Sequence, residues 1–311
     1  MSVSHQRPFY YLLIFCCCSI SLGGCNRQEQ PPSPQQAVTI QQIFRIGLIP
    51  EHNLFDQKKR YEPLLDYLAK RLGVAFEIVI LPRYGNIIDN FNELKLDGAF
   101  LGSFTGAMTI MKLGVVPIAR PQYEGGASTY FGIVFVKKGS GIRTAKSMRG
   151  KRMVFVDRAT TAGYLLPLAY FKELGITDYT KWFSECYFSG THEDAILDVL
   201  NNLADVGAAK NTVFYRLAAA DKRILAELDI LSTSPKVPSN GLMLKKDFPP
   251  ELKKKLRETL LSTKQTSEWQ NILKKLKIEK FINTSVDDYQ PVLNYAKNNG
   301  IDLATYRYQN F

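Results

Sequence analysis

Apolar residues recur along the chain in two alternating patterns from residue 44 onward. Short runs rich in β-branched and aromatic side chains predict strands at 44–49, 74–81, 97–101 and 115–119. Apolar positions at helical spacing predict helices at 61–72, 87–94 and 103–111. Strands that alternate with helices favour a parallel sheet covered on both faces, and the ligands of such sheets bind beyond the carboxyl ends of the strands.

A long apolar run at 130–136, followed by the polar, glycine-rich segment 137–141, predicts a strand that crosses into a second lobe. The alternation then resumes, with strands at 153–156, 185–188 and 205–208 and helices at 165–174, 192–203 and 213–220. Residues 230–232 and 241–244 are predicted to lead back to the first lobe. The chain from 251 onward is predicted to be mainly helical and basic.

These patterns together predict an α/β fold. We expect a two-lobed clamshell in which each lobe is a mainly parallel sheet flanked by helices, and in which two crossover strands join the lobes. Residues 42–136 plus 242–311 form the predicted lobe 1, and residues 137–241 form lobe 2. The ligand is expected between them.

The first 24 residues have the layout of a secretory signal peptide. Arg7 is the only charged residue before an apolar run at 9–20, which is too short to span a membrane as a helix. The run leads to Leu-Gly-Gly-Cys at 22–25, which resembles the bacterial lipobox and implies lipidation of Cys25; an ordinary signal peptide cleaved elsewhere is the alternative. Asn26 follows the cysteine in place of the Asp of the usual inner-membrane retention signal.

The segment behind this cysteine is rich in Gln and Pro and is predicted to be a flexible tether, so that residues 25–41 comprise the lipidated cysteine and the tether. Removing residues 1–24 from the 311-residue chain leaves 287 residues with a formal net charge of about +10, because the leader contains one Arg. That length suits two domains that each bury a core.

The composition of the body argues against several classes of function. Cys186 is the only cysteine beyond the leader and Cys25, and the body histidines are His52 and His192, so neither a disulfide nor a metal-ligand cluster is predicted. G-x-S-x-G, a P-loop and paired carboxylates in a motif context are all absent, so we expect neither an enzyme nor a cofactor. The basic residues of the C-terminal helices lack interleaved aromatic side chains, which favours a solvated, partly membrane-facing surface over a nucleic-acid site.

The segment 157–167, Asp-Arg-Ala-Thr-Thr-Ala-Gly-Tyr-Leu-Leu-Pro, carries the strongest site signal. It joins a predicted strand to a predicted helix, and Thr160, Thr161, Ala162 and Gly163 leave the first N–H groups of that helix uncovered. These N–H groups have no intrahelical partner and the helix dipole makes this end positive, so the turn suits an oxyanion. A hydroxyl-capped helix without a ligand is the alternative.

Similar turns occur twice more. Thr191 and Asp194 have capping-box spacing and place His192 in the first turn of a helix, either as a hydrogen-bond donor to an anion or as a solvated side chain. In lobe 1, Ser103 and Thr105 begin the third predicted helix, so two helix starts could share one anion across the cleft.

Three segments resemble the phosphate, phosphite and phosphonate substrate-binding proteins of ABC transporters. They are residues 60–68, residues 157–167, and residues 189–192 together with 205–208, and the likeness extends over roughly 46–244. The resemblance implies the type II periplasmic-binding fold, a clamshell that closes on its oxyanion. It also implies that Thr160 and Thr161 match the leading hydroxyls of the family's Ser-Thr-Ser-Gly-Tyr turn, and that His192 matches the family's histidine.

The sequence departs from that family at several positions. Ala162 replaces the third hydroxyl of the turn, and segment 102–106 lacks the family's tyrosine. Aminophosphonate binders of the family place carboxylates against the substrate ammonium, but segments 210–213 and 238–241 contain no acidic residue. These departures favour a smaller anion such as phosphate, phosphite or methylphosphonate.

We therefore expect an extracytoplasmic solute-binding lipoprotein that captures a small phosphorus oxyanion for an ABC transporter. The alternative is a binding protein of the same shape that senses its ligand for a membrane signalling kinase. The expected partners are the oxyanion, an ABC permease and, through the lipid anchor, a bacterial membrane facing the periplasm or the exterior; a monomer is expected, without nucleic acid. The candidate binding residues are Thr160, Thr161, Ala162, Gly163, Ser103, Thr105, His192, Tyr84 and Asn240.

Overall fold

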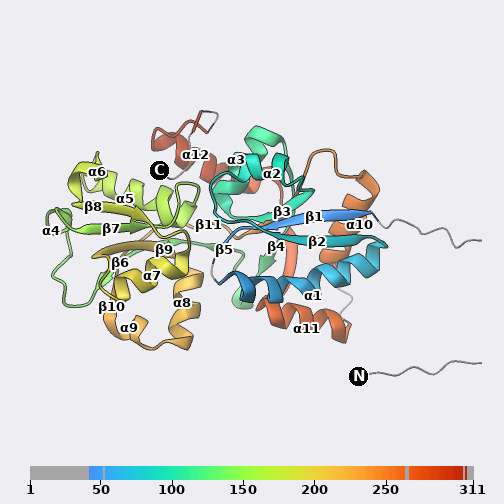
Figure 1. The fold of residues 1–311 in the computed structure, drawn as a ribbon, viewed down its shortest axis with the longest axis horizontal. Helices are drawn as coiled ribbons and strands as arrows, with labels where there is room; N and C mark the ends of the chain where they lie inside the picture. Colours follow the sequence, from blue (N-terminus) through green and yellow to red (C-terminus); the bar gives the residue numbers. More distant parts are fainter. Residues whose placement is uncertain (1–41, 52, 263–265, 304, 307–311) are drawn as a thin grey trace, which may run out of the picture. The chain divides into compact units, whose positions relative to one another are not determined.

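The computed structural model of this chain describes residues 42–51, 53–262, 266–303 and 305–306 (Figure 1). They belong to one compact unit, Gln41–Phe311, which is separate from Met1–Ile40. The predicted signal peptide, Cys25 and the tether therefore lie outside the described residues, as does His52.

Six strands form the first sheet, in the order β13-β4-β12-β3-β1-β2. Their bounds are Ile43–Leu48 for β1, Ala75–Ile80 for β2, Gly98–Leu101 for β3, Val116–Gln122 for β4, Gly241–Leu244 for β12 and Lys280–Asn283 for β13. β1 pairs in parallel with β2 and β3, whereas β12 is antiparallel to both β3 and β4, and β13 is antiparallel to β4. Four of the six strands thus share one direction, and the sheet is mainly parallel as predicted.

Helices cover both faces of this sheet (Figure 1). They are α1 (Leu54–Leu72), α2 (Ile87–Glu93), α3 (Ser103–Leu113), α10 (Pro250–Leu260), α11 (Ser267–Leu276) and α12 (Gln290–Asn298). Alternate side chains of β3 enter two different cores: Phe100 packs in the core that contains residues of α1, α10 and α11, and Ala99 and Leu101 in the core that contains residues of α2, α3 and α12. Burial on both faces explains why the strand is a continuous apolar run.

Five strands form the second sheet, in the order β10-β6-β9-β7-β8. Their bounds are Gly132–Lys137 for β6, Arg152–Phe155 for β7, Glu185–Phe188 for β8, Val206–Lys210 for β9 and Leu228–Thr233 for β10. β7 is parallel to β8 and β9, and β6 is antiparallel to β9 and β10. The helices of this lobe are α4 (Ala145–Met148), α5 (Leu166–Glu173), α6 (Tyr179–Trp182), α7 (His192–Leu200), α8 (Asn211–Ala220) and α9 (Arg223–Glu227).

Two short strands carry the chain between the sheets. β5 (Thr129–Tyr130) leads out of the first lobe, β11 (Val237–Pro238) leads back, and the two pair antiparallel, which confirms the predicted pair of crossover strands. The predicted lobe boundary at 136 is misplaced, because β6 already pairs in the second sheet; Gly241, assigned to lobe 2, begins β12 in the first. The break at Phe131 falls inside one apolar run, so the hydrophobic pattern did not reveal it.

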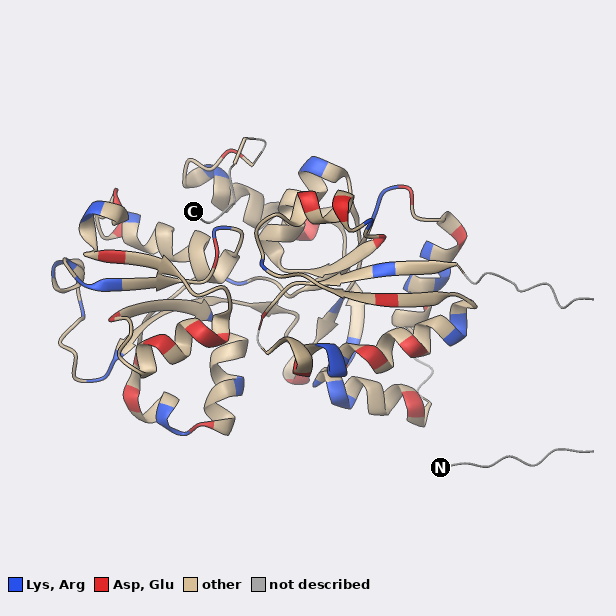
Figure 2. Ribbon diagram, in the orientation of Figure 1, with Lys and Arg blue, Asp and Glu red and all other residues tan. Residues whose placement is uncertain are grey.

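Charged residues of both signs are interspersed over the two lobes (Figure 2). On α1, for example, Lys58 forms an i,i+4 ion pair with Glu62. Both side chains are about half exposed, and ion pairs of this kind contribute little to stability.

Candidate functional site

A small cavity, of about 10 Å³, lies where the two lobes meet. Such a volume is close to that of one ordered water molecule. Its lining residues are Glu51, Tyr84, Gly102, Phe104, Thr105, Tyr130, Ala159, Thr160, Thr161, His192, Lys210 and Asn240. Several of them follow the carboxyl ends of β1, β3, β7 and β8 or end β9, which is where α/β sheets bind their ligands.

Six of the nine predicted binding residues line this cavity: Tyr84, Thr105, Thr160, Thr161, His192 and Asn240. Ser103, Ala162 and Gly163 are not part of the lining, although the first two are buried beside it. Glycine is required at 163 for packing, because a Cβ there would lie 2.4 Å from Cβ of Val156. The sequence arguments missed Glu51, Tyr130 and Lys210 as lining residues.

The central turn begins with a buried carboxylate. Asp157, two residues beyond the end of β7, accepts a hydrogen bond from the Ala159 N–H at 2.8 Å, and from the Gly85 N–H of the other lobe at 3.3 Å. The Thr160 hydroxyl donates to the Asp157 carbonyl oxygen at 2.6 Å, so its hydrogen is used inside the turn. Residues Thr161–Leu165 then form a π-helical turn that continues into α5, and its first N–H groups have no partner within the helix.

The two predicted helix starts touch each other. The Thr161 hydroxyl oxygen accepts from the Phe104 N–H at 2.9 Å and hydrogen-bonds with the Ser103 hydroxyl at 2.7 Å. The Ser103 hydroxyl in turn bonds with the hydroxyl of Tyr130, on a crossover strand, at 2.6 Å. Thr161 therefore caps α3 from the opposite lobe, and these hydroxyls join the two halves of the cleft.

His192 is held as a neutral hydrogen-bond donor. Thr191 caps α7 by accepting from the Asp194 N–H at 2.9 Å, which places His192 in the first turn with 3% of its surface exposed. Burial lowers the pKa of His192 to about 3, so the imidazole is uncharged at neutral pH. Its Nδ1 accepts from the Lys210 N–H at 3.2 Å, so the hydrogen of the neutral ring is on Nε2.

Tyr84 supplies a second donor. Its ring packs edge-on against the imidazole of His192, with centroids 5.8 Å apart. Its hydroxyl is buried and has no hydrogen-bond partner within the described part of the chain. Burial, followed by the charge of Glu51, raises the pKa of Tyr84 well above its ordinary value, so the hydroxyl keeps its proton.

A buried ion pair completes the cavity wall. The Lys210 Nζ, at the end of β9, lies 2.6 Å from Oε1 of Glu51 and 3.0 Å from Oδ1 of Asn240. The side chain of Lys210 is 3% exposed and that of Glu51 is 17% exposed. Burial alone would lower the pKa of Lys210, but the neighbouring Glu51 carboxylate outweighs it and the pKa is raised, so the ammonium stays charged.

Glu51 lies three residues beyond the end of β1 and Lys210 ends β9, and these positions near strand ends are a signal that could have pointed to both residues. The prediction for segment 210–213 concerned its lack of acidic side chains, so the lysine that begins the segment was missed. Among the described residues, no group of His, Cys, Asp and Glu is arranged to hold a metal ion.

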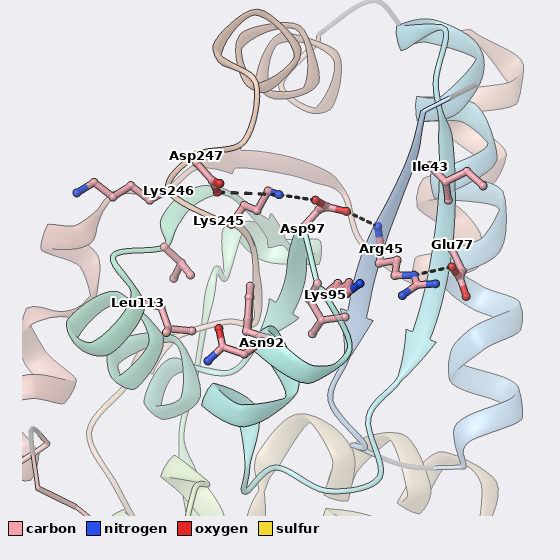
Figure 3. Close-up of a pocket in the computed structure, with 13 residues that line it drawn as sticks. Ile43, Arg45, Glu77, Asn92, Lys95, Asp97, Leu113, Lys245, Lys246 and Asp247 are labelled. Atoms are coloured by element: carbon pink, nitrogen blue, oxygen red, sulfur yellow. Dashed lines mark hydrogen bonds and ion pairs between the residues drawn. The ribbon is translucent and has the colours of Figure 1, made fainter. Parts of the chain in front are cut away.

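A larger hollow, of about 700 Å³, lies at the other end of the first sheet (Figure 3). It is open to solvent and is lined by paired charges: Arg45 with Glu77 at 2.9 Å, and Lys245 with Asp97 at 2.9 Å. Arg45 and Glu77 are about half exposed, and ion pairs of this kind contribute little. The smaller cavity, with its buried donors, is the better candidate site.

Comparisons with known proteins agree with the fold and show the family of the chain. The family model for the periplasmic substrate-binding protein of phosphonate ABC transporters matches residues 46–289. The "phosphate-import protein PhnD" of Mycolicibacterium smegmatis is 28% identical over 207 residues, which are 63% of this chain and 64% of that protein. The chain therefore matches slightly less than two thirds of that relative's length. The "phosphonates-binding periplasmic protein" of Escherichia coli is 23% identical over 251 residues, 78% of this chain and 73% of that protein.

Two solved structures show the same fold. A binding-protein component of a phosphonate ABC transporter from Pseudomonas aeruginosa has a TM-score of 0.77 at 23% identity, with 84% of this chain and 87% of that one covered. PhnD1 from Prochlorococcus marinus, solved in complex with methylphosphonate, has a TM-score of 0.73 at 20% identity, with 83% and 98% covered. Both confirm the predicted two-lobed architecture.

The family consists of periplasmic binding proteins, which confirms the prediction of a binding protein instead of an enzyme and implies an extracytoplasmic location. In the described ranges, no helix combines the length and the apolar composition needed to cross a bilayer. The match over most of the folded unit confirms the resemblance seen in the sequence: this chain belongs to the family of periplasmic substrate-binding proteins of phosphonate ABC transporters.

Proposed function

We propose that this protein captures a small phosphorus oxyanion (phosphate, phosphite or a small phosphonate) and delivers it to an ABC permease. The observation that carries the proposal is the Tyr84 hydroxyl, a buried donor without a partner in the described residues, in the wall of the cavity. A buried donor left unpaired costs free energy, which a ligand that accepts its hydrogen bond would recover.

The other groups around the cavity also suit an oxyanion. The Nε2–H of His192 is a neutral donor, and the first N–H groups of the π-helical turn, at Ala162 and Gly163, lie at the positive end of a helix. We propose that these groups, with the hydroxyls of Thr161 and Ser103 and the amide of Asn240, surround the phosphoryl oxygens. Thr160 and Thr105, whose hydroxyls donate to main-chain carbonyls, shape the wall of the site.

A thermal-shift screen of the folded body against phosphate, phosphite, methylphosphonate, sulfate and chloride would test this proposal. A ligand present at 100 times its dissociation constant should stabilise the protein by about 2.7 kcal/mol. We expect at least one phosphorus oxyanion to do so and chloride to have no effect. If none of the three phosphorus anions stabilises the protein, the proposed ligand class is wrong.

We further propose that the protein works as a monomeric lipoprotein, attached to a membrane of the cell envelope through Cys25. The Leu-Gly-Gly-Cys sequence at 22–25 and the polar segment behind it support this attachment. Deleting the protein should abolish high-affinity uptake of its ligand, whereas loss of signalling with unchanged uptake would support a sensor instead. Size-exclusion chromatography of the detergent-solubilised protein tests the oligomeric state, and we expect the elution volume of a monomer.

A further inference from the structure

The ammonium of Lys210 is enclosed by groups that come from separate segments of the chain. Glu51 follows β1, Tyr130 ends β5, and Asn240 follows β11. The Nζ atom lies 2.6 Å from the Glu51 carboxylate, 3.0 Å from the Asn240 amide oxygen and 4.4 Å from the centroid of the Tyr130 ring. We call Glu51, Tyr130 and Asn240 the ammonium cage.

The cage has the chemistry by which proteins recognise an ammonium group. A carboxylate supplies the countercharge and a strong acceptor, an amide oxygen accepts a second N–H, and an aromatic face attracts the cation through its quadrupole. None of these groups requires that the ammonium belong to the protein. All three residues, and Lys210 itself, also line the ligand cavity.

We infer that the ammonium cage is a ligand subsite that the chain fills with its own lysine. The inference rests on the proposed function and adds to it the identity of the residue that selects the ligand. With Lys210 in the cage, an aminoalkyl phosphonate finds its amine position occupied and meets a like charge in a buried site. The protein therefore takes phosphorus oxyanions without an amine, and shortening Lys210 converts it into a binder of aminoalkyl phosphonates.

The lysine also has a consequence for ligands without an amine. Glu51 lies in the same cavity wall, and its negative charge is compensated by Lys210 at 2.6 Å. When the side chain is cut back to Ala, that carboxylate opposes an incoming anion unless the anion brings its own cation. The same substitution should thus weaken one ligand class and strengthen the other.

The test is calorimetric titration of the full-length protein and its Lys210→Ala variant with methylphosphonate, aminomethylphosphonate, 2-aminoethylphosphonate and 3-aminopropylphosphonate. The three amines differ in the number of carbon atoms between phosphorus and nitrogen. The experiment shows which length spans the distance from the phosphoryl site to the cage. For the wild type we expect methylphosphonate to bind at least a hundredfold more tightly than any amine. In Lys210→Ala, at least one amine should gain tenfold or more over wild type, while methylphosphonate weakens.

Two control variants separate the cage from general effects. Glu51→Gln combined with Lys210→Ala removes the countercharge, so the gain for the amine should disappear. Lys245→Ala removes a lysine paired with Asp97 at the far end of the first sheet and should keep wild-type preferences. Should Lys210→Ala fold poorly, ethylamine added together with methylphosphonate should raise its melting temperature by refilling the cage.

The outcomes distinguish this inference from the proposed function. A wild type that binds none of the phosphorus anions contradicts the proposed function. A wild type that binds methylphosphonate, with a Lys210→Ala variant that gains no amine and is not rescued by ethylamine, overturns the inference alone. A wild type that binds the amines as tightly as methylphosphonate also overturns it.

Discussion

The tautomer of His192 is set by a hydrogen bond that its ring accepts from the main-chain N–H of Lys210, which lines the same cavity. Because the Lys210 N–H donates to Nδ1, the Nε2–H of the neutral ring is directed away from that bond. An asparagine can reproduce the Nδ1 acceptor with its amide oxygen and has no group at the position of Nε2. This difference makes it possible to separate the binding role of His192 from its structural role.

We predict that His192→Asn weakens ligand binding while the protein stays folded. One lost hydrogen bond to an anion is worth about 1–3 kcal/mol, or roughly five- to 150-fold in affinity. Titration of both proteins with methylphosphonate, or with whichever anion the screen identifies, measures the change. His192→Ala serves as the comparison, since it loses the acceptor as well and should also be less stable. An unchanged affinity in His192→Asn would mean that the side chain does not contact the ligand.

The low pKa of His192 also predicts an acid-sensitive stability. The imidazole titrates near pH 6.5 in an unfolded chain and near pH 3 in the folded protein, so between these values the unfolded state binds more protons. Its contribution to the free energy of unfolding is complete above pH 6.5 and is lost as the pH falls toward 3. From pH 7.5 to pH 5 the wild type should lose about 2 kcal/mol more than His192→Asn. Urea unfolding at both pH values measures this, and equal losses would contradict the neutral, buried state.

At the level of elements, the site is a contact between the start of α3 and the π-helical turn at Thr161–Leu165. The Thr161 hydroxyl takes the place of a cap residue for α3, although it belongs to the other lobe. The Thr160 hydroxyl, by contrast, donates to the Asp157 carbonyl, which also accepts the Thr160 N–H at 3.0 Å. The two adjacent threonines therefore have different structural roles.

We predict that Thr161→Val destabilises the protein more than Thr160→Val. Valine keeps the shape of threonine, but at 161 it leaves the buried Phe104 N–H without an acceptor, which costs about 1–3 kcal/mol. At 160 the carbonyl of Asp157 keeps one donor, so the expected cost is about 0.5–1.5 kcal/mol. Urea denaturation of the two variants gives the comparison. Equal costs would indicate that the lobes do not meet through Thr161 in solution.

Much of the fold was predictable from local patterns. The strands at 44–49, 97–101, 185–188 and 241–244 were placed within about one residue of β1, β3, β8 and β12, because their apolar runs and flanking breaks are local features. α1 was predicted to start seven residues late, because residues 56–60 are all polar and carry no apolar stripe. The helix in fact begins at its Asn53 cap and continues through Pro63. β13 was missed because it is a short edge strand between helices of a basic segment.

The site was predictable only in part. Thr160, Thr161 and His192 were found because helix-start chemistry leaves a signal within a few residues. The ammonium cage and its lysine were not predicted as a group, although Asn240 alone was. Glu51, Tyr130, Asn240 and Lys210 are distant in sequence, and only their positions at or near strand ends link them. Their meeting depends on where two sheets place the ends of their strands, which hydrophobic periodicity does not report.

For the whole molecule, the proposed anchor leads to a prediction about location. Cys25→Ala should move the protein from the membrane to the soluble fraction, because the 16 residues between Cys25 and the first described residue offer no apolar anchor of their own. Fractionation followed by immunoblotting measures this. As a control, Cys186→Ala should leave the distribution unchanged, since this cysteine lies within the folded body. Persistent membrane association of the Cys25→Ala variant would argue against lipidation.

The place of β12 between β3 and β4 imposes an order of events on folding. Of the strands in the first sheet, β12 and β13 come after the whole second lobe in the chain, and β12 is an interior strand of that sheet. Until β12 arrives, β3 and β4 have unpaired edges, and pairing them requires contacts across more than a hundred residues, which makes this step slow. The second lobe, whose strands are consecutive in the chain, can form first. A fragment that ends at residue 240 should therefore show protected amides in β6 to β10 and rapid exchange in β1 to β4; protection in both sets would mean that the first sheet folds without its central strand.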